Sequence, residues 1–254
     1  MNKGRVYLVG AGPGDPGLIT VKGLRLLRTA DVIIHDRLIP RDLLMEASPD
    51  AELIDVGKDP HLRRVKQEEI NQLMVERARQ GNVVVRLKGG DPCVLGRGGE
   101  EITALSEAGV DFEIVPGVSS FLAAPECAGI PLTFRGVSSS FAVITGREAR
   151  GKGRVFIDHK KIAEAVDTIV ILMGVETLEY TVLQLLKGGM DPATPVAVVE
   201  WGATERQRVA EGELRNIVKM VREANVQSPA VVVVGETVRT RGLVKHHLRG
   251  YANE

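Results

Sequence analysis

Short runs of β-branched and aliphatic residues alternate along the chain with longer stretches of helical periodicity. These runs predict strands at residues 5–9, 31–35, 52–56, 82–88, 110–115, 141–145, 168–173, 194–200 and 230–235. Apolar residues recur every three or four positions in residues 67–80 and 175–187, which predicts helices there. Apolar strands separated by helices are typical of parallel sheets covered on both faces. The pattern therefore predicts an α/β protein with mostly parallel sheets.

The predicted elements fall into two halves. The first comprises residues 1–117 and the second residues 138–254, with a connecting segment at residues 118–137. That segment contains a short apolar stretch, predicted as a helix over 119–128, and then the turn-rich Gly129-Ile130-Pro131. No low-complexity linker separates the halves, so we expect two α/β domains that pack closely and share a cleft.

Composition narrows the classes of protein. The 254 residues include 33 basic and 33 acidic side chains, and 44% of the chain is apolar, which excludes global disorder. Balanced charge and a 4% aromatic content argue against a nucleic-acid partner. Cys93 and Cys127 form neither a zinc pattern nor a disulfide framework, so no metal is expected. Without an apolar run near ~18 residues or a signal-peptide core, we expect a cytoplasmic protein with no membrane partner.

A glycine-rich turn follows the first predicted strand, from Gly10 to Gly17. It begins like the dinucleotide-binding fingerprint, but Asp15 occupies the position of the third glycine. Pro13 also removes a backbone donor where a pyrophosphate would need one. An NAD-linked oxidoreductase of the Rossmann type therefore remains only an alternative, as does a simple tight turn.

The loop after the fourth predicted strand has the most unusual composition. Five glycines occur within the eleven residues 89–99, which is costly in backbone entropy. Asp91 could accept hydrogen bonds from a ribose or a cationic ligand. Arg97 and Glu100 bring opposite charges to the start of the next helix, where Glu100 could alternatively serve only as a cap. We interpret this loop as a ligand-binding element.

Several of these strings resemble one family. Residues 9–20, V-G-A-G-P-G-D-P-G-L-I-T, resemble the opening of the tetrapyrrole methyltransferases. Residues 86–101, R-L-K-G-G-D-P-C-V-L-G-R-G-G-E-E, resemble the branch that methylates uroporphyrinogen III. Further matches, in order along the chain, are V-I-I-H-D-R-L (32–38), V-G-K (56–58), V-P-G-V-S-S (115–120), G-I-P-L-T-F-R-G (129–136), M-G-V (173–175) and P-A-V-V-V-V-G-E (229–236).

The resemblance implies a homodimer of two-domain chains that binds S-adenosylmethionine in the cleft between its domains and releases S-adenosylhomocysteine. It implies a tetrapyrrole substrate, uroporphyrinogen III, methylated at two ring carbons (C2 and C7) to give precorrin-2 for sirohaem or cobalamin. Such a reaction needs alignment and a proton acceptor rather than a metal. A methyltransferase acting on a later precorrin and a binding protein without catalysis remain alternatives.

The resemblance also implies roles for individual residues. Asp36 matches the family's proposed proton acceptor, and Lys58 matches the proton donor, although a solvated lysine at a strand end is the alternative for Lys58. Because the chain carries no net charge, attraction of a polycarboxylate needs a local basic cluster, for which Arg97 and Arg135 are the candidates. Glu100 is assigned to the same substrate site, although Arg97 could alternatively only pair with it at i,i+3. The implied cofactor contacts are Pro13, Gly89, Gly90, Asp91, Val94, Ser119, Ser120, Met173, Gly202 and Ala230.

Overall fold

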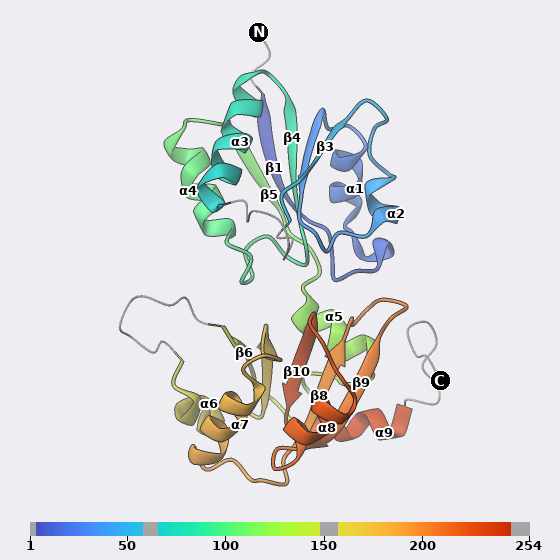
Figure 1. Ribbon diagram of the computed structural model, residues 1–254, viewed down its shortest axis with the longest axis vertical. Coiled ribbons are helices and arrows are strands. Elements are labelled where there is room, and N and C mark those ends of the chain that lie inside the picture. Colours follow the sequence, from blue (N-terminus) through green and yellow to red (C-terminus); the bar gives the residue numbers. More distant parts are fainter. Residues whose placement is uncertain (1–3, 58–65, 148–156, 245–254) are drawn as a thin grey trace. The chain divides into compact units, whose positions relative to one another are not determined.

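The computed structural model describes residues 4–57, 66–147 and 157–244. The chain divides into two compact units, Met1–Ser119 and Ser120–Glu254. Each unit contains a five-stranded sheet with helices packed on it (Figure 1). The α/β class predicted from the sequence is confirmed.

The first unit is built on a sheet in which every neighbouring pair of strands is parallel, in the order β3-β2-β4-β1-β5. Its strands are β1 (Arg5–Gly10), β2 (Val32–His35), β3 (Glu52–Asp55), β4 (Val83–Lys88) and β5 (Phe112–Val115). Its helices are α1 (Val21–Leu27), α2 (Arg41–Leu44), α3 (Gln67–Arg79) and α4 (Gly98–Glu107), with a 3-10 turn at Pro16–Leu18.

Alternate residues of β4 point to the two faces of this sheet. Val84 packs on one face in an apolar cluster with Met74 of α3 and Leu105 of α4. Leu87 packs on the other face with Leu27 of α1 and Leu43 of α2. Because both faces of the sheet are covered, its central strands are mostly apolar, with the buried Arg86 and Lys88 of β4 as exceptions.

The second unit has a mixed sheet, in the order β6-β7-β10-β8-β9. Its strands are β6 (Phe141–Thr145), β7 (Thr168–Leu172), β8 (Pro195–Glu200), β9 (Arg208–Glu213) and β10 (Ala230–Val234). Its helices are α5 (Ser120–Cys127), α6 (His159–Ala165), α7 (Leu178–Lys187), α8 (Ile217–Glu223) and α9 (Arg241–Val244), and a 3-10 turn spans Glu236–Thr240. Helix α5 packs on β7 and β10.

This sheet differs from the mostly parallel arrangement expected for the second half. Only β6 and β7 are parallel, whereas β10 runs antiparallel to both β7 and β8, and β8 pairs antiparallel with β9. Strand β9 was not predicted, because its sequence R-V-A-E-G-E contains three charged residues and a glycine. It lies at the edge of the sheet, where polar residues are tolerated because one side of the strand is not paired.

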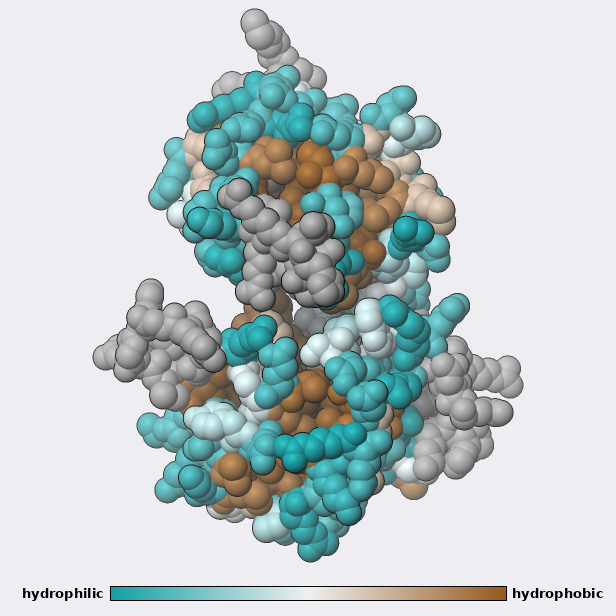
Figure 2. Space-filling model, viewed as in Figure 1, coloured by the Kyte–Doolittle hydropathy of each residue, from teal (hydrophilic) through white to brown (hydrophobic). Residues whose placement is uncertain are grey.

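Apolar side chains are also exposed on the surface. Phe134, Val137 and Phe141, which lie close together in sequence at the start of the second unit, are each more than 40% exposed. Figure 2 shows apolar surface, in brown, between hydrophilic side chains on both units.

Candidate active site

All five strands of the first sheet end at the same edge, because they are parallel. Gly10 of β1 pairs with Lys88 of β4, and His35 of β2 pairs with Leu87. The loops that follow these strands, which contain Pro13, Asp36 and Gly89, therefore begin side by side. Ligands of open α/β sheets bind at this edge.

Three glycines pack against one another where the loops leave the sheet. A Cβ atom on Gly10 would lie 2.6 Å from both the Cα of Gly117 and the carbonyl oxygen of Gly90. A Cβ on Gly117 would collide with the same oxygen. The backbones of the loops after β1, β4 and β5 thus come so close together that no side chain fits between them.

Gly89 is a different kind of glycine. It is exposed, and a Cβ placed on it would meet no atom of the described residues within 4 Å. Packing within the described part of the chain therefore does not require its lack of a side chain. The uncovered backbone of Gly89, at the start of the loop after β4, can lie flat against a planar ligand such as a nucleoside.

Asp91 connects two of the loops. Its Oδ1 accepts a hydrogen bond from the N–H of Cys93 at 2.8 Å, and its Oδ2 accepts one from the N–H of Gly117 at 3.1 Å. A carboxylate has about four acceptor positions, so two remain for a ligand. Asp91 therefore shapes the edge, whether or not it also contacts a ligand.

Arg97 and Glu100 form a two-pronged ion pair at the start of α4. Nε of Arg97 donates to Oε1 of Glu100 at 2.8 Å, and Nη2 donates to Oε2 at 2.6 Å. The hydrogen bonds from Arg97 lower the pKa of Glu100. Both side chains are about half exposed. The guanidinium has five N–H groups, so the pair leaves donors for a second carboxylate.

Asp36 directly follows β2 and forms an ion pair with Arg86, a residue that the sequence analysis did not identify. Nη2 of the buried Arg86 lies 2.5 Å from Oδ1 of Asp36. Arg86 and Lys88 also contact the buried carboxylate of Glu101 in α4. A signal for this cluster was present in the sequence: two cations alternate within the otherwise apolar strand β4. Lys58, the predicted proton donor, lies outside the described residues.

The second unit brings three predicted cofactor residues to one edge of its sheet. Ala230 pairs with Glu200 at the end of β8, and the adjacent Val231 pairs with Leu172 at the end of β7. Met173 follows β7 directly and is 47% exposed, and Gly202 follows β8. The antiparallel direction of β10 places its first residue beside the ends of its neighbours.

Gly202 also has a packing reason to be glycine, because a Cβ there would collide with the Cβ of Ala124 in α5. Of the remaining predicted residues, Ser119 is buried and Ser120 begins α5. Val94 is half-buried in the glycine loop, and Arg135 is exposed on the turn between Phe134 and Ser138.

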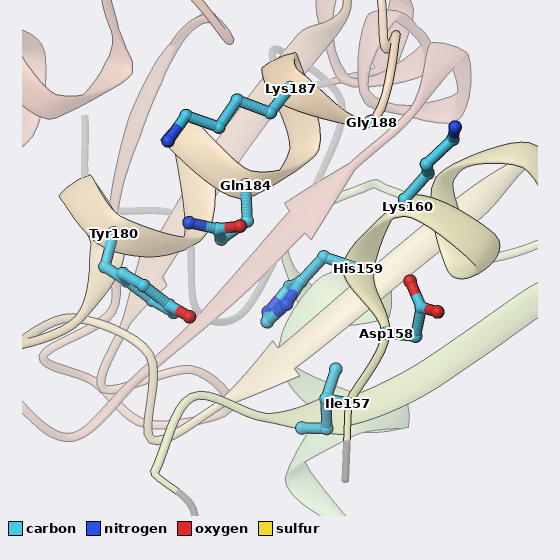
Figure 3. Close-up of a pocket in the computed structure, with 8 residues that line it drawn as sticks. All are labelled: Ile157, Asp158, His159, Lys160, Tyr180, Gln184, Lys187 and Gly188. Carbon is cyan, nitrogen blue, oxygen red and sulfur yellow. The ribbon is translucent and has the colours of Figure 1, made fainter. Parts of the chain in front are cut away.

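A cavity of about 500 Å³ lies between α6 and α7 of the second unit, and none of its lining residues belongs to the predicted site. Figure 3 shows His159 and Tyr180 facing each other there; their rings meet edge to face at 6.1 Å. Among the described residues, no cluster of His, Cys, Asp and Glu could hold a metal ion. No helix in the described part of the chain is long and apolar enough to span a membrane.

The fold defines an α/β protein whose first, parallel sheet ends in glycine-rich loops. A model of the tetrapyrrole (corrin/porphyrin) methylases matches residues 5–218. The chain is 51% identical over 236 residues to the uroporphyrinogen-III C-methyltransferase of Methanocaldococcus jannaschii, covering 92% of this chain and 97% of that protein. It therefore belongs to the tetrapyrrole methylase family.

Two further comparisons describe this similarity. The chain is 50% identical over 238 residues to a uroporphyrinogen-III C-methyltransferase of Bacillus subtilis (strain 168), covering 94% of this chain but only 49% of that protein, so it spans about half the length of this relative. Among solved structures, the uroporphyrin-III C-methyltransferase of Thermus thermophilus complexed with S-adenyl homocysteine matches with a TM-score of 0.79 and 43% identity, covering 92% of this chain and 99% of that one.

Proposed function

We propose that this chain catalyses the S-adenosylmethionine-dependent methylation of uroporphyrinogen III at two ring carbons, C2 and C7, giving precorrin-2. The observation that carries the proposal is the loop at residues 86–101. Its sequence resembles that of enzymes with this activity, and it lies at the carboxyl edge of a parallel sheet with Gly89 uncovered. The 51% identity to a relative of similar length, which is named uroporphyrinogen-III C-methyltransferase, supports the same function.

The residues at the edge fit S-adenosylmethionine. Gly89 offers open backbone, Asp91 has acceptor positions left after its two backbone hydrogen bonds, and the exposed Met173 offers a soft apolar surface. When bound, the cofactor supplies a methyl group activated by positive sulfur. The residues proposed to hold it are Pro13, Gly89, Gly90, Asp91, Val94 and Ser119 in the first unit, and Ser120, Met173, Gly202 and Ala230 in the second.

The chain's own residues would bind the tetrapyrrole and move a proton. Asp36, 37% exposed at the end of β2, is proposed to accept the proton that the methylated ring loses. Lys58 is proposed as the proton donor. Arg97 and Arg135 would bind carboxylates of the substrate, because a guanidinium holds a carboxylate with two parallel hydrogen bonds. Glu100 would orient Arg97 through their ion pair.

The alternatives differ in what supports them. Family membership argues against an NAD-linked oxidoreductase, and nothing in the comparisons favours one. A methyltransferase for a later precorrin belongs to the same family, but the relatives reported above are named for uroporphyrinogen III or uroporphyrin III. A binding protein without catalysis would not need an exposed Asp36.

The test is to incubate the purified protein anaerobically with S-adenosylmethionine and uroporphyrinogen III and to follow the product by mass and absorption spectrum. We expect two methyl groups to be added and S-adenosylhomocysteine to be released. Binding of both compounds without methylation would favour the binding protein. Activity only on a substrate that is already methylated would favour the later precorrin.

The proposal also covers the oligomeric state of the enzyme, its location in the cell and the fate of its product. We propose a cytoplasmic homodimer whose product enters sirohaem or cobalamin synthesis, as the family resemblance implies. The exposed apolar residues Phe134, Val137 and Phe141 are compatible with a subunit interface. Analytical ultracentrifugation of the protein tests the oligomeric state, and a monomer at micromolar concentration would contradict it.

A further inference from the structure

A cluster of charged side chains is buried beneath the edge of the first sheet. Arg86 and Lys88 of β4 have side chains that are 3% exposed, and the side chain of Glu101 in α4 is fully buried. Nε of Arg86 donates to Oε1 of Glu101 at 3.0 Å, and Nζ of Lys88 lies 3.0 Å from Oε2. The amide of Gln67, at the start of α3, also donates to Oε1, at 3.2 Å.

The guanidinium of Arg86 connects this cluster to Asp36. Its Nη2 donates to Oδ1 of Asp36 at 2.5 Å, and its Nη1 donates to the carbonyl oxygens of Ile34 and Leu87, both at 3.3 Å. A guanidinium is planar and rigid, so a hydrogen bond that fixes Nε also fixes the direction of Nη2. Glu101 and Asp36 therefore hold two sides of one rigid group.

Stability alone does not account for this arrangement. Buried ion pairs are often no more stabilising than apolar residues of similar volume, because removing the charges from water costs about as much as their attraction gains. The cluster balances two cations, Arg86 and Lys88, against two anions, Glu101 and Asp36. Of these four residues, Asp36 alone has a substantially exposed side chain. The other three form a buried support under it.

We propose that Glu101 is a positioning residue for Asp36 and acts through Arg86. By holding Nε of the guanidinium, Glu101 aims Nη2 at Oδ1 and keeps the carboxylate of Asp36 in one orientation at the sheet edge. The inference rests on the proposed function, in which Asp36 accepts a proton from the methylated ring. Displacing a reacting group by about 1 Å can reduce turnover ~100-fold, so its support matters for rate.

Two double variants separate positioning from charge balance. Lys88→Met removes one buried cation, and Glu101→Gln or Glu101→Leu removes one buried anion, so both pairs leave Arg86 balanced by Asp36. The introduced glutamine can still accept the hydrogen bond from Nε, whereas leucine has a similar size and no acceptor. We expect kcat of the double variant with Glu101→Leu to be ~10-fold or more below that of the double variant with Glu101→Gln. Both values are calculated per titrated S-adenosylmethionine-binding site. KM for uroporphyrinogen III and cofactor affinity should agree within about twofold, since neither involves Glu101.

Equal kcat in the two double variants would overturn the inference. If the leucine variant does not fold, as judged from its melting curve, Glu101→Asp provides the second test, because it keeps the charge and withdraws the carboxylate by one methylene. Glu101→Asp should lower kcat when it is introduced into the wild type. Introduced into Asp36→Asn, it should not lower the residual kcat further, because the carboxylate that Glu101 positions is already absent. An equal loss in both backgrounds would contradict the inference. If the wild-type protein does not methylate uroporphyrinogen III, the proposed function and this inference are both refuted. If the wild type is active but the two double variants have equal kcat, only the inference is refuted.

Discussion

Gly90 donates its backbone N–H to the carbonyl oxygen of Gly12 at 2.7 Å, and Gly12 donates back to Gly90 at 3.3 Å. This reciprocal pair joins the loops after β1 and β4, although the two glycines are 78 positions apart in the sequence. Neighbouring glycines in one glycine-rich loop consequently have different roles: Gly90 packs against backbone, and Gly89 faces open space.

Substitution of Gly89 should separate binding from folding. Gly89→Val places its side chain in open space, so the melting temperature should change little, whereas the added volume covers the backbone proposed to contact the nucleoside. We expect S-adenosylmethionine binding, measured by isothermal titration calorimetry, to be lost. Gly242→Val in α9 is a matched control, because a Cβ there also meets no atom of the described residues within 4 Å. Wild-type affinity in Gly89→Val would contradict the assignment of the loop.

Gly10 should respond in the opposite way. A Cβ at this position lies 2.6 Å from backbone atoms of Gly90 and Gly117, which cannot move aside as a side chain can. We expect Gly10→Ala to lower the free energy of unfolding by ~1–3 kcal/mol or more. Urea denaturation measures this, with Gly89→Ala as the control that should unfold like the wild type. Equal stability of both variants would show that the three-glycine contact is loose.

Removal of the Asp36 carboxylate should affect turnover more than binding. Asp36→Asn keeps the shape of the side chain but cannot accept a proton, and general-base catalysis is typically worth ~10²–10⁴ in rate. We expect kcat to fall by about this factor, while affinity for S-adenosylmethionine stays within about twofold. Steady-state assays at saturating uroporphyrinogen III and S-adenosylmethionine measure the effect. A kcat equal to that of the wild type would assign Asp36 a structural role instead.

The two proposed substrate arginines should tolerate lysine poorly. Arg97→Lys and Arg135→Lys keep the charge but lose the planar pair of donors, and a hydrogen bond to a charged group is worth ~1.5–3 kcal/mol. We expect each variant to bind the tetrapyrrole roughly tenfold or more weakly. The melting temperature should hardly change, because an exposed pair such as Arg97–Glu100 contributes only ~0–1 kcal/mol.

Cofactor affinity is the internal control for these arginine variants and should match that of the wild type. If the double variant binds the tetrapyrrole with wild-type affinity, neither arginine contacts the substrate. The search would then move to Arg63 and Arg64, the basic pair that follows the predicted V-G-K motif.

Because of Asp167, the stability of the second unit should decrease at acidic pH. Its Oδ2 accepts hydrogen bonds from the backbone N–H groups and hydroxyls of Ser139 and Ser140. The N–H of Ser139, followed by the hydroxyl of Ser140, lowers the pKa of Asp167. A carboxyl whose pKa is lowered by folding stabilises fully above its unfolded value of ~3.9, and this contribution is lost as the pH falls through the folded pKa.

We therefore expect Asp167→Asn to melt at a lower temperature than the wild type at neutral pH. The difference should shrink as the pH is lowered below ~3.9, because the wild-type carboxyl is then also becoming neutral. Thermal melts across this range measure the difference. A gap in melting temperature that stays constant with pH would mean that the charge of Asp167 contributes nothing.

The sequence by itself determined the α/β class and most of the elements. Local periodicity was sufficient for this, because the strands of the first sheet are covered on both faces and helix α3 carries a regular apolar stripe from Ile70 to Ala78. Motif spacing also identified the loops after β1 and β4. Parallel strands then bring these loops to one edge without further information.

Only the tertiary structure decided which residues that are far apart in the sequence come into contact. The direction of β10, which brings Ala230 beside Glu200, depends on pairing with strands 30 or more residues away rather than on its own apolar sequence. Strand β9 is stabilised by its partner β8 and not by its composition. The need for glycine at position 202 arises from the approach of Ala124. The support of Asp36 by Arg86 and Glu101 likewise depends on burial and side-chain direction, which arise only when β2, β4 and α4 pack together.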